Sequence, residues 1–413
     1  MTGRLNIALD FGAGTGPVAV GQIGWDSMRR EAAAEWDPAF AARPLPISPL
    51  LVKTHAGLLR PRGRAFDGLP GVFGDSLPDG WGRLLIDREL QSRGRSLADI
   101  TPLDRLAMVG LDGMGALTYR PEEVPEPVAE IDLDWFAGLV PQVEEGASTS
   151  ELERLRAVAG GSQGARPKFV AQLSPDGDRL RSHRLPLEPG WRHVMIKRRA
   201  ERDPDGAVEA EAAYARMAKD AGIEMAWTGV LRSDRGEPFF VTDRFDRVGA
   251  GRLHMQTVAA LLEVDFREAM LDYSELLRVV RHVTRDIRAT EEMYRRMIFN
   301  ARALNRDDHL KNHAFLMRAS GAWQLAPAYD LSFSQGPGGE HTLTIGDEGR
   351  RPGTSAFAEV AKDAGIRPRR ATEIIAQVDG AIARWHDHAQ AEHVPPALRA
   401  RISGAMAEAK RWP

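Results

Sequence analysis

The 413-residue chain contains no cysteine. This absence excludes disulfide bonds, thiol catalysis and cysteine-ligated zinc, and it is typical of proteins in a reducing cytoplasm. The sequence also lacks any apolar run close to the roughly 18 residues of a membrane span. Its first 24 residues lack the basic start and apolar core of a signal peptide. We therefore expect a cytoplasmic protein with no membrane partner.

Net charge is nearly absent as well, because 55 basic and 58 acidic side chains leave a formal charge of −3. This balance argues against binding to nucleic acid through overall charge, so only a local basic patch could provide such binding. No histidine stands at metal-ligand spacing with a second histidine and a carboxylate, which argues against a zinc site. The 43% hydrophobic and 27% charged content is ordinary for a globular protein, and the length allows two lobes.

Composition and periodicity divide the chain into three parts. Residues 1–125 are rich in glycine and proline and read as short strands and a few helices, and the prolines within 121–127 favour a linker. Residues 126–250 mix strands and helices. Residues 251–413 are mainly helical, with helices expected over 356–365, 369–390 and 395–411. The expected fold class is α+β.

The most informative stretch runs from Asn305 to Asn312. In it Asp307 stands five residues before Asn312, and Asp330 follows 18 residues after that asparagine. Phosphoryl-transfer enzymes use this spacing: the first carboxylate orients the attacking hydroxyl, and the asparagine and second aspartate hold the Mg²⁺ ions that neutralise the nucleotide phosphates. Such a transition state needs positioning and charge compensation more than covalent help. The spacing therefore indicates an ATP-dependent kinase.

The flanks of this stretch place both aspartates on loops. Apolar residues at helical spacing predict a helix over 291–304 with two glutamates in its first turn. Residues 314–317 and 323–325 read as a hairpin that ends shortly before Asp330. The plainer alternative is a solvated polar loop with two unrelated aspartates.

The middle of the chain contains what a phosphate-binding lobe needs. The glycine-rich segment 160–168 precedes a strand over 169–173, and glycines let consecutive backbone N–H groups turn toward an anion. A second strand, 193–197, ends in Lys197, which could neutralise phosphates, and segment 239–247 stands where an adenine-binding hinge belongs. The plainer explanation for the glycine-rich segment is an ordinary hairpin connection. The plainer explanation for Lys197 is a charge on an edge strand.

Two other patterns point elsewhere. Asp10-Phe11-Gly12 has the same residues as a kinase Mg²⁺ motif. Together with Gly14-Thr15-Gly16 it is also similar to the phosphate loop of actin-like ATPases, but nothing downstream supplies the rest of the actin-like fold. A basic run could bind nucleic acid or could be a solvated face beside a nucleotide. Its members are Arg179, Arg181, Arg184, Arg192, Lys197, Arg198, Arg199 and Arg202.

Six motifs along the chain carry a family resemblance. They read VFGDSLPDGW at 72–81, MVGLDGMGAL at 108–117, GARPK at 164–168, RFDR at 244–247, DDHLKN at 307–312 and LAPAYDL at 325–331. In this order they resemble the HipA-like serine/threonine kinases, the toxins of bacterial type II toxin–antitoxin systems, over nearly the whole chain. The first two matter most, because ordinary protein kinases have no such N-terminal subdomain.

The resemblance implies a role for each matching residue. Asp307 would be the catalytic carboxylate, and Asn312 and Asp330 would be Mg²⁺ ligands. The residues implied in ATP binding are Gln163, Gly164, Ala165, Arg166, Pro167, Lys168, Lys197, Asp243, Arg244, Phe245, His309 and Lys311.

The resemblance also implies a fold and partners. The fold would be two-lobed and protein-kinase-like, with an α/β N-terminal lobe that includes a small β-rich subdomain and an all-helical C-terminal lobe. The three parts would be an N-terminal HipA-type subdomain (1–125), the nucleotide-binding part of the kinase core (126–250) and a helical C-terminal kinase lobe (251–413). The implied partners are a helix-turn-helix, HipB-like antitoxin, operator DNA bound through the antitoxin complex, and a protein substrate such as an aminoacyl-tRNA synthetase.

One position departs from the family pattern. Members that silence themselves phosphorylate a serine seven residues before the lysine that matches Lys168, and this chain has Gly161 there. Ser162 is the nearest hydroxyl, and a phosphate on it would add negative charge inside an anion site and expel ATP. The hydroxyls at 148–150 stand at an expected helix start, where capping is their predicted role.

Three function hypotheses follow. The first is an ATP-dependent serine/threonine protein kinase that acts as a toxin by phosphorylating a translation component. The second is a DNA-bound scaffold that bridges antitoxin dimers with minor kinase activity, although the presence of Asp307, Asn312, Asp330 and Lys197 argues against full loss of activity. The third is a kinase for a small molecule, and nothing in the sequence excludes it.

Overall fold

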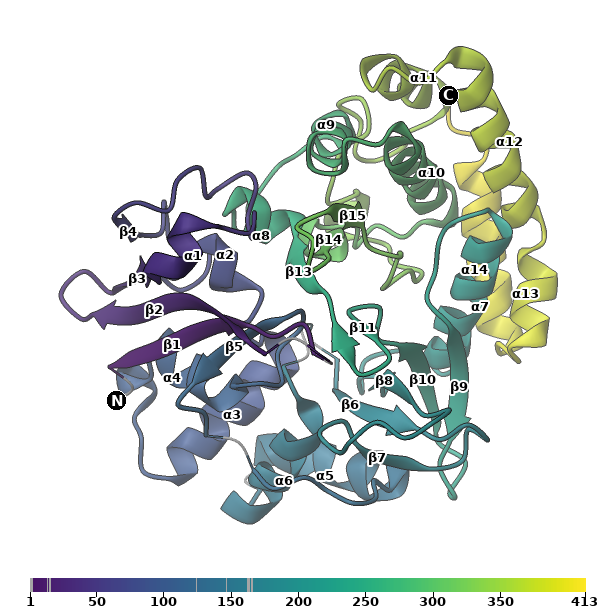
Figure 1. The fold of residues 1–413 in the computed structure, drawn as a ribbon. Coiled ribbons are helices and arrows are strands. Elements are labelled where there is room, and N and C mark those ends of the chain that lie inside the picture. Colours follow the sequence, from purple (N-terminus) through teal and green to yellow (C-terminus); the bar gives the residue numbers. More distant parts are fainter. Residues whose placement is uncertain are drawn as a thin grey trace. The chain divides into compact units, whose positions relative to one another are not determined.

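The computed structural model describes residues 3–413 except 13, 15, 124, 146, 162, 163 and 165. It is an α+β structure, as expected (Figure 1). The chain forms two compact units, and each is assembled from separate segments. Unit 1 comprises Met1–Ala200, Leu231–Asp265 and Leu316–Ala322, and unit 2 comprises Glu201–Val230, Phe266–Phe315 and Trp323–Pro413. The boundaries at 125 and 250 stay a prediction.

The first sheet of unit 1 is antiparallel, with the strand order β4-β3-β2-β1-β5. Alternate residues of β1 (Leu5, Ile7 and Leu9) are buried, as in a sheet with one packed face. Its strands are β1 (Arg4–Leu9), β2 (Val18–Asp26), β3 (Glu31–Trp36), β4 (Leu58–Leu59) and β5 (Leu117–Arg120). Nearby in sequence are the helices α1 (Pro38–Ala42), α2 (Gly71–Gly74), α3 (Gly80–Ser92) and α4 (Pro102–Val109).

The string Asp10-Phe11-Gly12 forms a turn in unit 1. Asp10 Oδ1 accepts the N–H of Gly12 at 2.9 Å. Gly12 has a φ of +79°, and a Cβ there would lie 2.6 Å from the carbonyl oxygen of Ala250. Only glycine fits this close backbone approach, so packing explains the glycine of this string.

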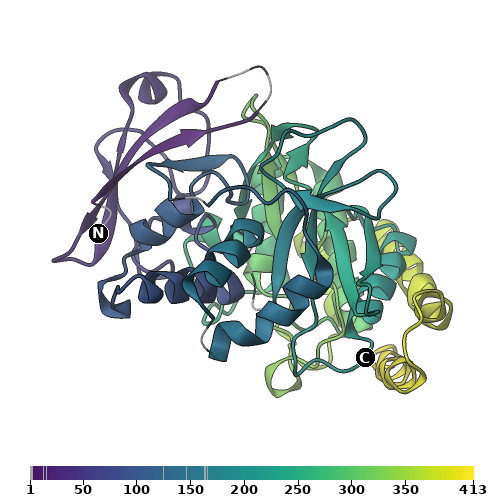
Figure 2. The ribbon, with the colours of Figure 1, turned by 90° about the horizontal axis from the view of Figure 1, so that it is seen from below.

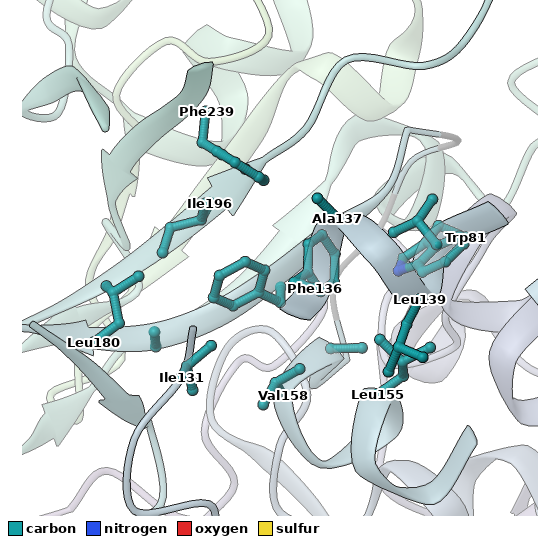
Figure 3. Packing of buried hydrophobic residues seen from close by; sticks show 14 of the residues in the cluster. Trp81, Ile131, Phe136, Ala137, Leu139, Leu155, Val158, Leu180, Ile196 and Phe239 are labelled. Atoms are coloured by element: carbon teal, nitrogen blue, oxygen red, sulfur yellow. The ribbon is translucent and has the colours of Figure 1, made fainter. Parts of the chain in front are cut away.

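The second sheet has the strand order β7-β6-β8-β10-β9. One of its faces packs against the helices α5 and α6, and Figure 3 shows Phe136 and Val158 of these helices in one apolar cluster with Ile196 and Phe239 of the sheet. The strands are β6 (Lys168–Leu173), β7 (Leu180–Ser182), β8 (Arg192–Lys197), β9 (Thr228–Arg232) and β10 (Pro238–Asp243), and the helices are α5 (Leu133–Glu145) and α6 (Thr149–Ala159). Four short elements follow: β11 (Arg247–Val248), β12 (Gly251–Arg252), β13 (His254–Thr257) and α8 (Val258–Leu262).

Helix α6 begins where the sequence predicts. Ser148 is its N-cap, and its side chain accepts the N–H of Glu151 while the Glu151 side chain accepts the N–H of Ser148. This reciprocal capping box satisfies two N–H groups that the helix itself cannot bond. The capping role of Ser148 is thereby confirmed.

Unit 2 is mainly helical. Figures 1 and 2 both show its C-terminal helices α12, α13 and α14 packed beside one another. Its helices are α7 (Ala207–Asp220), α9 (Tyr273–Thr284), α10 (Ile287–Ala303), α11 (Thr354–Asp363), α12 (Pro368–Ala383), α13 (Trp385–Ala391) and α14 (Pro396–Ala409). The hairpin of β14 (Ala314–Met317) and β15 (Trp323–Leu325) is as predicted. Within the described part of the chain, no helix is both long and apolar enough to cross a membrane.

Two helix predictions need correction. The helix expected over 369–390 is broken at Arg384, which joins α12 to α13. The helix expected from 291 begins earlier, at Ile287 with Asp286 as its cap, so the two glutamates lie beyond its first turn. Neither boundary carries a proline or glycine signal in the sequence.

Candidate active site

The loop after α10, residues 305–313, is here called the catalytic loop. It separates two adjacent aspartates into different environments. The Asp307 side chain is 64% exposed, whereas that of Asp308 is 0% exposed. The sequence shows two equivalent carboxylates, and the structure leaves only Asp307 accessible to a substrate.

Asp308 holds the catalytic loop in place through its buried carboxylate. Its carboxylate accepts hydrogen bonds from Tyr273 Oη (3.1 Å), the backbone N–H of Thr342 (3.0 Å) and His341 Nδ1 (3.1 Å). Tyr273 Oη in turn accepts a hydrogen bond from Asn300 Nδ2 at 2.9 Å. A carboxylate with three donors can stay buried, since its lost hydration is replaced. These donors fix the backbone on which Asp307 stands.

The asparagine of the motif is tied to the same loop. Asn312 Nδ2 donates to the backbone carbonyl of Asp307 at 2.7 Å. This bond uses the amide nitrogen and leaves Oδ1 as the oxygen available to a cation. His309 Nε2 lies 3.9 Å from Asp307 Oδ1. Three predicted site residues therefore lie together at one end of the loop.

Asp330 follows β15 on a second loop of unit 2. Its φ is +53°, the left-handed region that aspartate enters more readily than most residues. The preceding residue, Tyr329, donates its hydroxyl hydrogen to the backbone carbonyl of Lys311 at 2.6 Å. One hydrogen bond therefore joins the residue before Asn312 to the residue before Asp330.

Phe266 is a contact residue that the sequence motifs do not reveal. Its ring centroid lies 4.6 Å from that of His309, and Lys311 Nζ lies 5.1 Å from the same centroid. A cation over an aromatic face is stabilised by the ring quadrupole. Phe266 thus orients both side chains that the family resemblance assigns to the phosphates. It stands outside every motif, so only the structure reveals it.

The histidine next to Asn312 is unsuited to carry charge. Burial lowers the pKa of His313 to about 4, so its imidazole is neutral near pH 7. Its ring packs edge-on against Tyr273 at 5.9 Å. His313 therefore supports the loop structurally, and any positive charge that offsets phosphate charge must come from other residues.

In unit 1, strand register places two lysines side by side. Lys168 of β6 stands opposite Lys197 of β8, and Lys197 stands opposite Phe240 of β10. Side chains at directly opposed positions share a face of the sheet. The other face carries the apolar residues packed against α5 and α6, among them Phe169 and Ile196. The lysine-bearing side, here called the lysine face, is thus the face turned away from that core.

The glycine-rich segment is tied to unit 1 at both ends of its described part. Gly161 donates its N–H to Asp112 O at 3.1 Å, and the N–H of Gly164 donates to the Asp79 carboxylate. Asp79 is the N-cap residue of α3, but its side chain makes no cap hydrogen bond there. Lys168 Nζ lies only 2.5 Å from where a Cβ on Gly164 would stand. Ser162, Gln163 and Ala165 lie outside the described residues.

The segment after β10 is fixed by a buried charge cluster. Asp246 accepts hydrogen bonds from Arg244 (2.8 Å), Arg247 (2.6 Å) and the N–H of Gly115 (2.7 Å). Burial alone would raise the pKa of Asp246, but the two guanidinium groups and the N–H hold it well below its usual range. The guanidinium of Arg244 is therefore engaged, and its contact with adenine would have to come from the backbone.

The other predicted residues of this segment are more accessible. Asp243 and Phe245 are both half-buried, and Asp243 Oδ1 lies 3.7 Å from Arg192 Nη1. Arg166 is also half-buried, whereas Pro167 is buried and accepts the N–H of Arg198 at 2.9 Å.

Asn312 and Asp330 offer oxygen atoms, the type of ligand that Mg²⁺ takes in proteins. Among the described residues, no group of three or more histidine, aspartate or glutamate side chains is arranged to hold a metal ion. Mg²⁺ is commonly bound by one or two protein oxygens, with water and substrate phosphate completing the octahedron. The amide oxygen of Asn312 and the carboxylate of Asp330 fit that pattern.

Two family models match the chain. The model for the HipA N-terminal domain matches residues 15–120, and the model for the HipA-like C-terminal domain matches residues 160–385, more than half of the chain. No curated protein matches the sequence.

Solved structures give a fold likeness. HipA of Shewanella oneidensis MR-1, solved with HipB and its operator DNA, is similar with a TM-score of 0.69 at 17% identity, over 99% of this chain and 97% of that chain. The Helicobacter pylori proinflammatory kinase CtkA gives a TM-score of 0.34 at 11% identity, over 54% of this chain and 93% of that chain. The first likeness shows a shared fold, and the second is too distant to add to it.

Proposed function

Since the chain belongs to the HipA-like family, we propose that it is an ATP-dependent serine/threonine protein kinase and the toxin of a toxin–antitoxin pair. The observation that carries the proposal is the contrast between exposed Asp307 and its buried neighbour Asp308. A loop that buries one carboxylate as an anchor and presents the next to solvent suits a residue that must receive a substrate hydroxyl.

Each part of the reaction is assigned to residues of this chain. Asp307 would orient the attacking hydroxyl and accept its proton. Asn312 and Asp330 would hold Mg²⁺, and Lys168 and Lys197 would offset phosphate charge from the lysine face. Mg·ATP would supply the phosphoryl group and the metal charge that phosphoryl transfer requires. The remaining nucleotide contacts are proposed for residues 163–167, 243–245, His309 and Lys311.

Partners are proposed by analogy with the similar structure. That HipA was solved with HipB and operator DNA, so we propose a helix-turn-helix antitoxin as partner here, with operator DNA bound through the antitoxin. A translation component such as an aminoacyl-tRNA synthetase is the proposed protein substrate. The cytoplasm is the proposed location.

Growth of a bacterial host tests this function. Expression without an antitoxin should slow or arrest growth, and Asp307→Asn should abolish the effect because the hydroxyl-orienting carboxylate is lost. Asp387→Asn, an equal change at an exposed position of α13, is the matched control and should stay toxic. A harmless parent chain that phosphorylates a metabolite in vitro would contradict the toxin proposal in favour of a small-molecule kinase.

A further inference from the structure

Unit 2 contains a cavity of about 300 Å³ beside the support of the catalytic loop. His341 and Thr342, two residues of its wall, are also two of the donors that hold Asp308. The wall further includes Glu340, Asp347, Glu348 and Arg350. A volume of about 300 Å³ is at the lower end of the range for small-ligand pockets.

The wall of this cavity is held in place by hydrogen bonds. Asp272, the N-cap of α9, accepts hydrogen bonds from Thr344 Oγ1 (2.8 Å) and from the N–H of Asp347 (3.1 Å). The N–H of His341 donates to Gly349 O at 2.8 Å. These bonds hold the segment 341–349 in place as part of the cavity wall.

The charged groups of the wall are mostly acceptors. Three carboxylates stand against one guanidinium, Arg350, and that guanidinium already pairs with Glu340 at 2.9 Å. Backbone N–H groups of Arg350 and Arg351 lower the pKa of Glu348, so this side chain stays ionised. The excess negative charge comes from Asp347 and Glu348, which are both exposed.

A buried histidine supplies an independent observation. Because a carboxylate can only accept, the contact with Asp308 places a proton on His341 Nδ1. The His341 side chain is 0% exposed, and Nε2 has no hydrogen-bond partner among the described residues. Nε2 lies on the ring edge away from Asp308. A buried ring nitrogen without a partner is costly, so a partner is expected there.

We propose that this cavity binds a basic side chain, arginine or lysine, of the protein substrate. Guanidinium and ammonium groups carry only donors and positive charge, which complement the carboxylates of Asp347 and Glu348 and can supply a donor to the unpartnered ring nitrogen of His341. Asp308 accepts hydrogen bonds from His341 and Thr342 of the cavity wall and is joined to Asp307 by one peptide bond, so the proposed basic residue would flank the substrate hydroxyl. The inference deepens the proposed kinase function by defining its substrate class.

Peptide selection and binding test this proposal separately from catalysis. Serine peptides with arginine, alanine or glutamate at each flanking position are assayed for phosphoryl transfer, and fluorescein-labelled versions are assayed for binding by polarisation. The wild-type chain should favour arginine at one position, and Asp347→Asn combined with Glu348→Gln should reduce that preference by about tenfold in both assays. Charge reversal of both residues to lysine should favour glutamate instead.

Matched variants separate the cavity from general charge effects. Glu359→Gln combined with Asp363→Asn removes the same charge from the exposed surface of α11 and should leave the arginine preference unchanged. In His341→Asn nothing replaces Nε2, so the arginine preference should fall; the melting temperature should fall as well, because His341 is one of the donors to buried Asp308, and the peptides are compared well below it. Loss of preference in the α11 variant would overturn the proposal.

The outcomes also distinguish a failure of the kinase function from a failure of the cavity proposal. Peptide binding that needs Asp347 and Glu348, without any phosphoryl transfer, would overturn the kinase function and retain the cavity. Transfer or binding without preference for a basic residue would overturn the cavity and retain the kinase. Binding of free spermidine that depends on Asp347, without peptide preference, would show a small-cation site and overturn the substrate assignment.

Discussion

The catalytic loop of unit 2 and the lysine face of unit 1 are positioned by different physical means. The loop depends on side-chain hydrogen bonds to one buried carboxylate, Asp308. The lysine face depends on backbone register, which sets Lys168 opposite Lys197 whatever their side chains do. Register is a property of whole strands and tolerates single substitutions, whereas a network with one central acceptor does not. The loop should therefore be the more fragile of the two.

Asp308→Ala should break the loop most severely. It leaves the buried hydrogen-bond donors of Tyr273 and Thr342 unsatisfied, each at about 1–3 kcal/mol, so the free energy of unfolding should fall by roughly 3 kcal/mol. Urea denaturation measures the change. The adjacent Asp307→Asn should change stability by less than about 0.5 kcal/mol, as is usual for exposed positions. Equal stability losses in the two variants would contradict the division of roles.

Lys197→Met should test the lysine face without unfolding it. The methionine keeps the apolar stem on the strand but removes the charge, so ATP affinity should fall by about tenfold, measured by calorimetry, while the melting temperature stays close to that of the parent. Lys168→Met is the companion variant and should act in the same direction. A parent-like ATP affinity in both variants would show that the lysine face does not contact phosphate.

Tyr329→Phe should loosen the link between the two proposed Mg²⁺ ligand loops. The variant loses only the hydroxyl that bonds Lys311 O, a bond of about 1 kcal/mol. The Mg²⁺ concentration for half-maximal thermal stabilisation in the presence of ATP should rise by about fivefold. Tyr294→Phe, which removes a hydroxyl bonded to Phe357 O elsewhere in unit 2, is the control and should leave the Mg²⁺ dependence unchanged. A shift in the control alone would contradict the assignment.

Phosphorylation of Ser162 should have the smallest effect on ATP binding among these changes. Incubation with Mg·ATP should add one phosphate there, and repulsion between the phosphoserine and the nucleotide phosphates should weaken ATP binding. Ser162→Ala should remain active and be more toxic than the parent, and Ser162→Asp should be weakened. Mass spectrometry locates the phosphate, and finding it only at residues 148–150, or nowhere, would refute the prediction.

The sequence predicted what local patterns determine. The cap at Ser148, the hairpin of β14 and β15, and the strand that ends in Lys197 all follow from short-range signals. The support of the catalytic loop could not be predicted in this way. Tyr273 and His341 reach Asp308 from 35 and 33 residues away, and no spacing rule pairs them. Asp79 shows the same limit, because its side chain stands at the start of α3 but bonds the distant Gly164 instead of the helix.

The segmented composition of unit 1 has a consequence for synthesis on the ribosome. Residues 316–322 belong to unit 1, although most of that unit precedes Ala200. At about 5–20 residues per second, the roughly 120 intervening residues take on the order of 6–24 s to translate. Until then the nascent chain has an incomplete unit 1 and no Asp330. The proposed kinase activity would need both, so it could arise only after residue 330 has been translated.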